Sequence, residues 1–191
     1  MKGLIDLLKS RKRFLFKCLL ITISFYLLFT LLERNIYFAI ADKRHLCLPY
    51  RYWIIKKGNI TPHRGQYIAF RPHGTPYIPD GTEWIKMVSG LPGDRIEIKE
   101  MNEPWTRVVF VDGNPVELRA VKNVILHTDR ESIVFPVYEK DTRGRPLPVI
   151  KPQVIPEGKL FVSSPHIRSY DSRYWGLVDE SWITGRAYPL Y

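Results

Sequence analysis

Two side chains have the chemistry to cleave a peptide bond together: the thiol of Cys47 and the amine of Lys86. A thiol is more acidic than a hydroxyl, so an uncharged amine within reach can take its proton and leave a nucleophilic thiolate. Lys86 lies between Ile85 and Met87 in a run typical of a strand, and burial of that strand would disfavour the ammonium form. The pair therefore suggests a nucleophile and a general base.

Each residue also has an ordinary structural explanation. An isolated cysteine commonly packs as a small buried hydrophobic residue, and a lysine on an edge strand faces solvent. The other cysteine, Cys18, falls in an apolar run, so we do not expect it to pair with Cys47. His45 would share a strand face with Cys47, which leaves open a Cys–His pair that works without Lys86.

The elements that position these residues begin with an apolar run at residues 14–32, which follows a basic segment. As a helix this run would span about 28 Å, close to the thickness of a bilayer core. No small-residue cleavage site follows it, so we expect an uncleaved anchor at residues 14–34. The preceding basic segment, residues 1–13, is expected in the cytoplasm, which places residues 36–191 in the periplasm of a bacterium, across its inner membrane.

Beyond the anchor, short aromatic and β-branched runs alternate with turns rich in Gly, Pro, Asn and Asp. This pattern predicts a mainly β domain over residues 36–191, and no stretch after residue 40 has helical periodicity. A hairpin is expected over residues 108–118, and residues from about 100 to 155 are expected to form an insertion of strands and loops. The other expected strands are residues 52–55, 66–70, 84–88, 95–98 and 159–162.

Composition and motifs narrow the classes of function. The net charge is +10, but beyond residue 13 the basic residues are interspersed with acids and no nucleic-acid module is recognisable, so we expect no nucleic-acid partner. The basic surface is better explained by anionic lipid headgroups. Metal-binding and nucleotide-binding motifs are absent from the sequence, and we expect no metal or cofactor.

Three segments carry a resemblance to a known family: HLCLPYRYW at residues 45–53, WIKMVSGLPGD at residues 84–94, and residues 156–187. In this order they resemble bacterial type I signal peptidases, and more closely the TraF-type peptidases of conjugative transfer in the same superfamily. Cys47 stands where the family has its nucleophilic serine, and Lys86 stands at the catalytic lysine. Residues 163–166, Ser-Ser-Pro-His, replace the Gly-Asp-Asn-Arg run of the housekeeping enzymes.

The resemblance implies a signal-peptidase-like β fold, an acyl-enzyme mechanism and several supporting residues. Ser169 matches the serine that orients the lysine amine. Asp171 and Arg173 match an ion pair that connects the third segment, residues 156–187, to the region of the nucleophile. The backbone N–H of Cys47 would be one donor to the oxyanion, and the second donor would fall on His45.

The expected function is therefore an endopeptidase that processes a membrane-associated precursor, such as a conjugative pilin or a protein with a signal peptide. The resemblance implies small residues one and three positions before the cut. An apolar face beside Trp53 and Trp84 is expected to rest on membrane lipid. Two alternatives stay open: an inactive relative that acts as an assembly component of a conjugation or secretion system, and a general leader peptidase.

Overall fold

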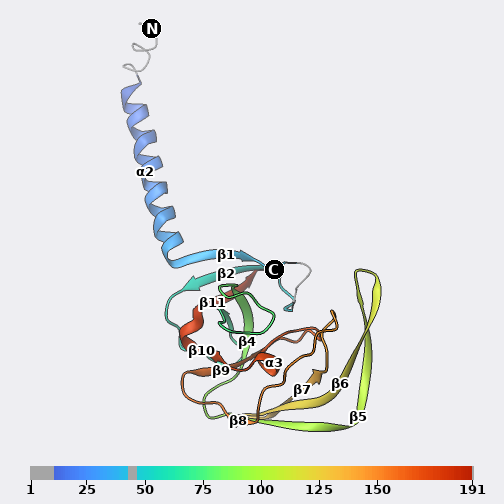
Figure 1. The fold of residues 1–191 in the computed structure, drawn as a ribbon. Helices are drawn as coiled ribbons and strands as arrows, with labels where there is room; N and C mark the ends of the chain where they lie inside the picture. The colour runs from blue at the N-terminus through green and yellow to red at the C-terminus, as the bar shows by residue number, and fades with distance from the viewer. Residues whose placement is uncertain (1–10, 43–46, 191) are drawn as a thin grey trace. The chain divides into compact units, whose positions relative to one another are not determined.

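The computed structural model describes residues 11–42 and 47–190 and divides the chain into two units, residues 1–37 and 38–191. Figure 1 labels most of the elements. The helical elements are α2 (Lys12–Asn35), α3 (Ser172–Trp175) and η2 (Glu180–Trp182). The strands are β1 (Ile36–Ile40), β2 (Tyr52–Lys57), β3 (Tyr67–Phe70), β4 (Trp84–Gly90), β5 (Arg95–Val111), β6 (Asn114–His127), β7 (Ser132–Tyr138), β8 (Gln153–Val154), β9 (Lys159–Ser163), β10 (Val178–Asp179) and β11 (Ile183–Leu190).

The first unit is built on α2, a helix of 24 residues whose apolar side chains are exposed along its length. At 1.5 Å per residue it is about 36 Å long, which is enough to cross the hydrocarbon core of a bilayer. Among the described residues it is the one helix with the length and composition for this role. The prediction of an N-terminal apolar helix is confirmed, with bounds a few residues wider than expected.

The second unit is mainly β, as the sequence predicts, and its strands form two sheets. The larger has seven strands in the order β1-β2-β11-β3-β4-β9-β10, and the smaller has four in the order β7-β6-β5-β8. β4 lies inside the larger sheet, where it pairs antiparallel with β3 on one side and β9 on the other. A residue in the middle of β4 is therefore not on an edge strand.

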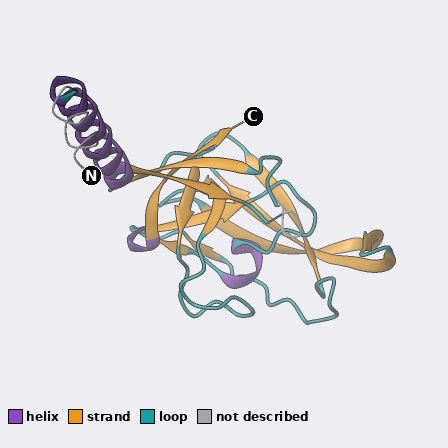
Figure 2. Ribbon diagram, turned by 90° about the horizontal axis from the view of Figure 1, so that it is seen from above, coloured by secondary structure: helices purple, strands orange, loops and turns teal. Residues whose placement is uncertain are grey.

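A long hairpin of β5 and β6 extends away from the rest of this unit (Figures 1 and 2). Val111 pairs with Asn114, so only Asp112 and Gly113 form the turn. Both have positive φ, 49° and 82°, as a type I′ turn requires. The hairpin expected at residues 108–118 is the tip of this longer one, because β5 and β6 pair from residue 95 to residue 127 with one register shift.

The core lies where the four-stranded sheet, β9 and α3 meet. Its buried members include Leu126 of β6, Phe161 of β9 and Tyr174 of α3. The sequence predicted no helix after residue 40, and α3 corrects this. One turn is too short to have a detectable period, and α3 depends instead on its cap, since the side chain of Asp171 accepts a hydrogen bond from the Arg173 N–H.

The contact of lipid with an apolar face beside Trp53 and Trp84 stays a prediction, but the ring of Trp53 itself is not part of an exposed face. Trp53 is only 1% exposed, and its ring makes edge contacts with Tyr50 and Tyr67, with centroids 5.5 and 5.1 Å away. β2 has neighbours on both sides, and the ring packs inside this aromatic cluster. Trp84 is partly buried and packs against the cluster of apolar residues that includes Val88.

Candidate active site

Lys86 is buried in the middle of β4, where it is 1% exposed and pairs in register with Ile68 of β3. Alternation along the strand puts Trp84, Lys86 and Val88 on one face of the sheet. The amine donates a hydrogen bond of 2.9 Å to the hydroxyl of Ser169 and lies 5.1 Å from the centre of the Trp84 ring. Within residues 11–42 and 47–190, no carboxylate forms an ion pair with it. The amine is therefore held by a hydroxyl and an aromatic ring.

The backbone around Ser169 is fixed by a buried ion pair. Arg173 donates two hydrogen bonds to the carboxylate of Asp171, from Nε at 2.7 Å and from Nη2 at 2.8 Å. The side chain of Arg173 is 4% exposed and that of Asp171 is 0% exposed. Burial opposes the charge on Arg173, but the attraction and hydrogen bonds of Asp171 outweigh it and raise the pKa of Arg173. Arg173 also donates to the backbone carbonyl of Ser169 at 3.1 Å.

The same ion pair joins parts of the chain that are distant in sequence. Arg173 donates to the carbonyl of Pro136 in β7 at 3.1 Å, and Asp171 accepts from the N–H of Ser164 at 3.3 Å. The contacts described for the pair thus link the segment that holds Ser169 to β7 and to the end of β9. A link to the nucleophile turn remains a prediction.

Cys47 lines the same groove as Lys86 and Ser169, a hollow of about 920 Å³. The residue is partly buried and precedes the buried Leu48. Its thiol makes no hydrogen bond with another described residue, Lys86 included. The structure therefore brings the thiol and the amine to one groove without a direct bond between them. His45, proposed as a second oxyanion donor or a partner of Cys47, lies outside the described residues.

His166 is a groove residue to which the sequence assigned no role. Its Nδ1 accepts a hydrogen bond of 3.1 Å from the N–H of Arg168, so the neutral ring carries its proton on Nε2. Burial, Arg168 and Lys86 lower the pKa of His166, in that order of size. The signal available in the sequence was its position in the Ser-Ser-Pro-His run that departs from the family pattern.

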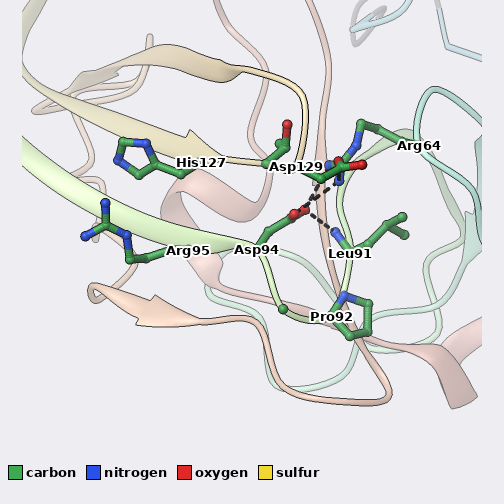
Figure 3. Close-up of a pocket in the computed structure, with 9 residues that line it drawn as sticks. Arg64, Leu91, Pro92, Asp94, Arg95, His127 and Asp129 are labelled. Carbon is green, nitrogen blue, oxygen red and sulfur yellow. Dashed lines mark hydrogen bonds and ion pairs between the residues drawn. The ribbon is translucent and has the colours of Figure 1, made fainter.

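A second hollow, of about 510 Å³, lies beside the Leu-Pro-Gly-Asp turn that follows β4 (Figure 3). Here Asp94 accepts from Arg64 at 2.8 Å and from the N–H of Leu91 at 2.7 Å. Arg64 also donates to the carbonyl of Ser89 in β4 and reaches Asp129 at 3.3 Å. These contacts fix the end of the strand that carries Lys86, so we assign the hollow to the scaffold.

The sequence matches a known family of proteins and several of its characterised relatives. Residues 11–191 match the model of the family described as signal peptidase, peptidase S26. The chain belongs to this signal peptidase family. Among relatives, the conjugal transfer protein TraF of Agrobacterium fabrum (strain C58) is 34% identical over 107 residues, which cover 56% of this chain and 48% of TraF. Signal peptidase IB of Staphylococcus aureus is 31% identical over 107 residues, which cover 54% of this chain and 50% of that protein.

The chain spans about half the length of the curated relatives it matches. The resemblance to signal peptidases of the TraF type is thus confirmed. The roles of Cys47, Lys86, Ser169, Asp171 and Arg173 stay predictions, although the last four form one connected set of hydrogen bonds.

Proposed function

We propose that this signal peptidase relative is a membrane-anchored endopeptidase that cuts a membrane-associated precursor, with Cys47 as nucleophile and Lys86 as general base. The precursor class we favour is a pilin or another protein of a conjugative transfer system, because relatives named as conjugal transfer proteins are among those that match. The carrying observation is the buried amine of Lys86, held by Ser169 in a groove that Cys47 also lines.

Burial favours the uncharged form of an amine, which is the form that can act as a base. Lys86 would take the proton of the Cys47 thiol, and the thiolate would attack the carbonyl carbon of the scissile bond. When the tetrahedral intermediate collapses, the C–N bond breaks and Lys86 returns the proton to the leaving amine, which leaves a thioester. Water, deprotonated by Lys86, would then release the thiol and the new carboxylate.

Ser169 would keep the amine pointed into the groove during both proton transfers, and the Asp171–Arg173 pair would hold Ser169 in place. The backbone N–H of Cys47 is the proposed first donor to the oxyanion. His45 is the proposed second donor, by analogy with the family's hydroxyl at that position.

We further propose that α2 crosses a bacterial inner membrane once, with the basic N-terminal residues in the cytoplasm and the β unit in the periplasm. This placement follows from the cluster of Lys and Arg before the helix. Anchoring would confine the enzyme and its precursor to one bilayer, which raises the rate at which they meet.

A second candidate is a general leader peptidase. The match to Signal peptidase IB of Staphylococcus aureus favours it, since that relative is about as similar to this chain as the conjugal transfer proteins are. The proposed chemistry is the same, and the two candidates differ in which precursors are cut.

The test is co-expression of the full chain with a candidate pilin precursor or a secreted precursor, and comparison of the unaltered protein with Cys47→Ala, Cys47→Ser and Lys86→Met. We expect shortening of the pilin precursor by the unaltered protein and none by Cys47→Ala or Lys86→Met. Shortening of the secreted precursor alone would support the general leader peptidase. Equal processing by all variants would rule out the peptidase assignment to these residues.

A further inference from the structure

The groove that Cys47 and Lys86 line is larger than the small side chains expected just before the cut. Its volume of about 920 Å³ is near the upper end of the roughly 300–1,000 Å³ typical of ligand sites. Part of its wall comes from the four-stranded sheet and the loop after β7. A precursor segment lying in the groove would therefore contact residues well beyond the scissile bond.

One stretch of this wall is apolar, and we call it the hairpin wall: Leu118, Tyr138, Leu147 and Ile167. Leu118 and Tyr138 are buried in one cluster, and Leu147 and Ile167 pack against it while staying partly exposed. The buried hydroxyl of Tyr138 has no hydrogen-bond partner among the described residues. The partly exposed side chains of Leu147 and Ile167 thus give the hairpin wall a surface that can take an apolar side chain.

Three cations that form no ion pair with a described residue line the groove near the hairpin wall. Lys140 and Arg143 come from the loop after β7, and Arg168 follows Ile167. None of the three forms an ion pair with a carboxylate of the described residues. The lowered pKa of His166, caused in part by Arg168 and Lys86, agrees with a positive field at this place.

The acidic residues of the groove do not cancel this field. Asp141 already binds Arg145 through its side chain at 2.6 and 2.7 Å, and Glu83 accepts from Thr184 at 2.8 Å. Asp42 also lines the groove and makes an interaction of its own, and Asp112, in the hairpin turn, is one further acid of the lining. Lys140, Arg143 and Arg168 thus outnumber Asp112 among the groove charges that form no ion pair with a described residue, and the balance of charge beside the hairpin wall is positive.

Building on the proposed function, we propose that the hairpin wall and Lys140, Arg143 and Arg168 form a specificity subsite. Its occupant is a precursor segment in which an apolar side chain adjoins acidic ones. The apolar side chain packs on Leu147 and Ile167, and the carboxylates pair with the cations. A precursor with glutamine in place of these acids would lose the ion pairs and keep the apolar contact.

The test uses the full chain in detergent, with Cys47→Ala to stop turnover, and fluorescein-labelled peptides of 16 residues with an Ala-Leu-Ala core. The two peptides of a pair differ in one feature: a second leucine is flanked by two Glu in one peptide and by two Gln in the other. In the first pair this leucine lies four residues after the Ala-Leu-Ala core. In the second pair the leucine lies four residues before the core. Fluorescence anisotropy should show about fivefold tighter binding of the Glu peptide in one pair, reduced by added salt.

Lys140→Glu/Arg143→Glu should abolish or invert this preference. The matched control is Lys151→Glu, because Lys151 is exposed and outside the groove, and it should leave the preference unchanged. Equal binding of Glu and Gln peptides in both pairs, no measurable binding of any peptide, or a preference that survives the double charge reversal would overturn the inference. Failure of the peptidase proposal is separate, because the unaltered chain would then leave the intact precursor uncut, or Cys47→Ala would shorten it as well.

Discussion

The amine of Lys86 donates to the hydroxyl of Ser169 at 2.9 Å, across 83 positions of sequence. Behind this contact, Arg173 holds the Ser169 carbonyl and is itself held by Asp171. A strand of the larger sheet and a short capped helix are thereby joined through one hydroxyl. The orientation of the buried amine depends on that hydroxyl and on the ion pair that fixes its backbone.

Ser169→Ala removes this hydroxyl without changing the fold. We expect precursor processing to fall by about 10- to 100-fold, because an amine free to rotate is rarely aligned with its nucleophile. The free energy of unfolding should change by only about 1 kcal/mol, the usual effect of one hydrogen bond. The measurements are a processing time course and chemical unfolding, and the control is Ser181→Ala at an exposed serine. A normal processing rate in Ser169→Ala would contradict the positioning role.

Arg173→Ala leaves the carboxylate of Asp171 buried without its partner. We expect the free energy of unfolding to fall by about 3–5 kcal/mol, since an unpaired buried charge is strongly unfavourable. The control is Arg119→Ala, which breaks an exposed pair with Glu139 and should cost less than about 1 kcal/mol. Denaturant unfolding of the full chain in detergent measures both. Similar losses in the two variants would show that the buried ion pair contributes no more to the free energy of unfolding than the exposed one.

Asp94→Asn tests the contacts that fix the end of β4. It weakens the ion pair with Arg64 at a side chain that is 8% exposed, and we expect a loss of about 1–3 kcal/mol in the free energy of unfolding. The control is Asp129→Asn, because Asp129 is the outer partner of Arg64 and its side chain is 71% exposed. Its free energy of unfolding should stay within about 0.5 kcal/mol of that of the parent. If both changes have the same small effect, Asp94 does not brace the strand.

His166 should make stability depend on pH. Its pKa is lowered in the folded chain by burial, Arg168 and Lys86, while the unfolded chain protonates it near pH 6.5. As pH falls, the unfolded state thus binds the proton first. The contribution of neutral His166 to the free energy of unfolding is therefore present in full above about pH 6.5 and is lost as pH falls through the pKa of the folded state. We expect His166→Gln to lose less stability than the parent between pH 7.5 and pH 5. Equal losses, measured by thermal unfolding, would contradict this.

The overall class of fold follows from local patterns in the sequence, whereas the pairing of its strands does not. The runs around Trp53, Lys86 and Phe161 predicted strands because their alternation is local. The extent of β5 and β6 is set by pairing across 33 residues, from Arg95 to His127, and only their Asp-Gly turn has a sequence signal. The burial of Trp53 also depends on distant partners such as Tyr67, which no local pattern reveals.

The site shows the same division. The motif resemblance pointed to Lys86 and Ser169, and the structure joins these two residues directly. His166 and Arg64 were not singled out, because a histidine beside a proline and an arginine in a turn have no pattern that reveals their neighbours. Folding brings them to Lys86 and to the end of β4 respectively.

The most direct test of the proposed dyad is the reactivity of Cys47 with and without Lys86. In a Cys18→Ser chain, Cys47 is the remaining thiol, so iodoacetamide reports on it alone. At pH 7 we expect alkylation several times faster than in the same chain carrying Lys86→Met, because the amine promotes formation of the thiolate. Equal rates in the two proteins would mean that Lys86 does not activate Cys47.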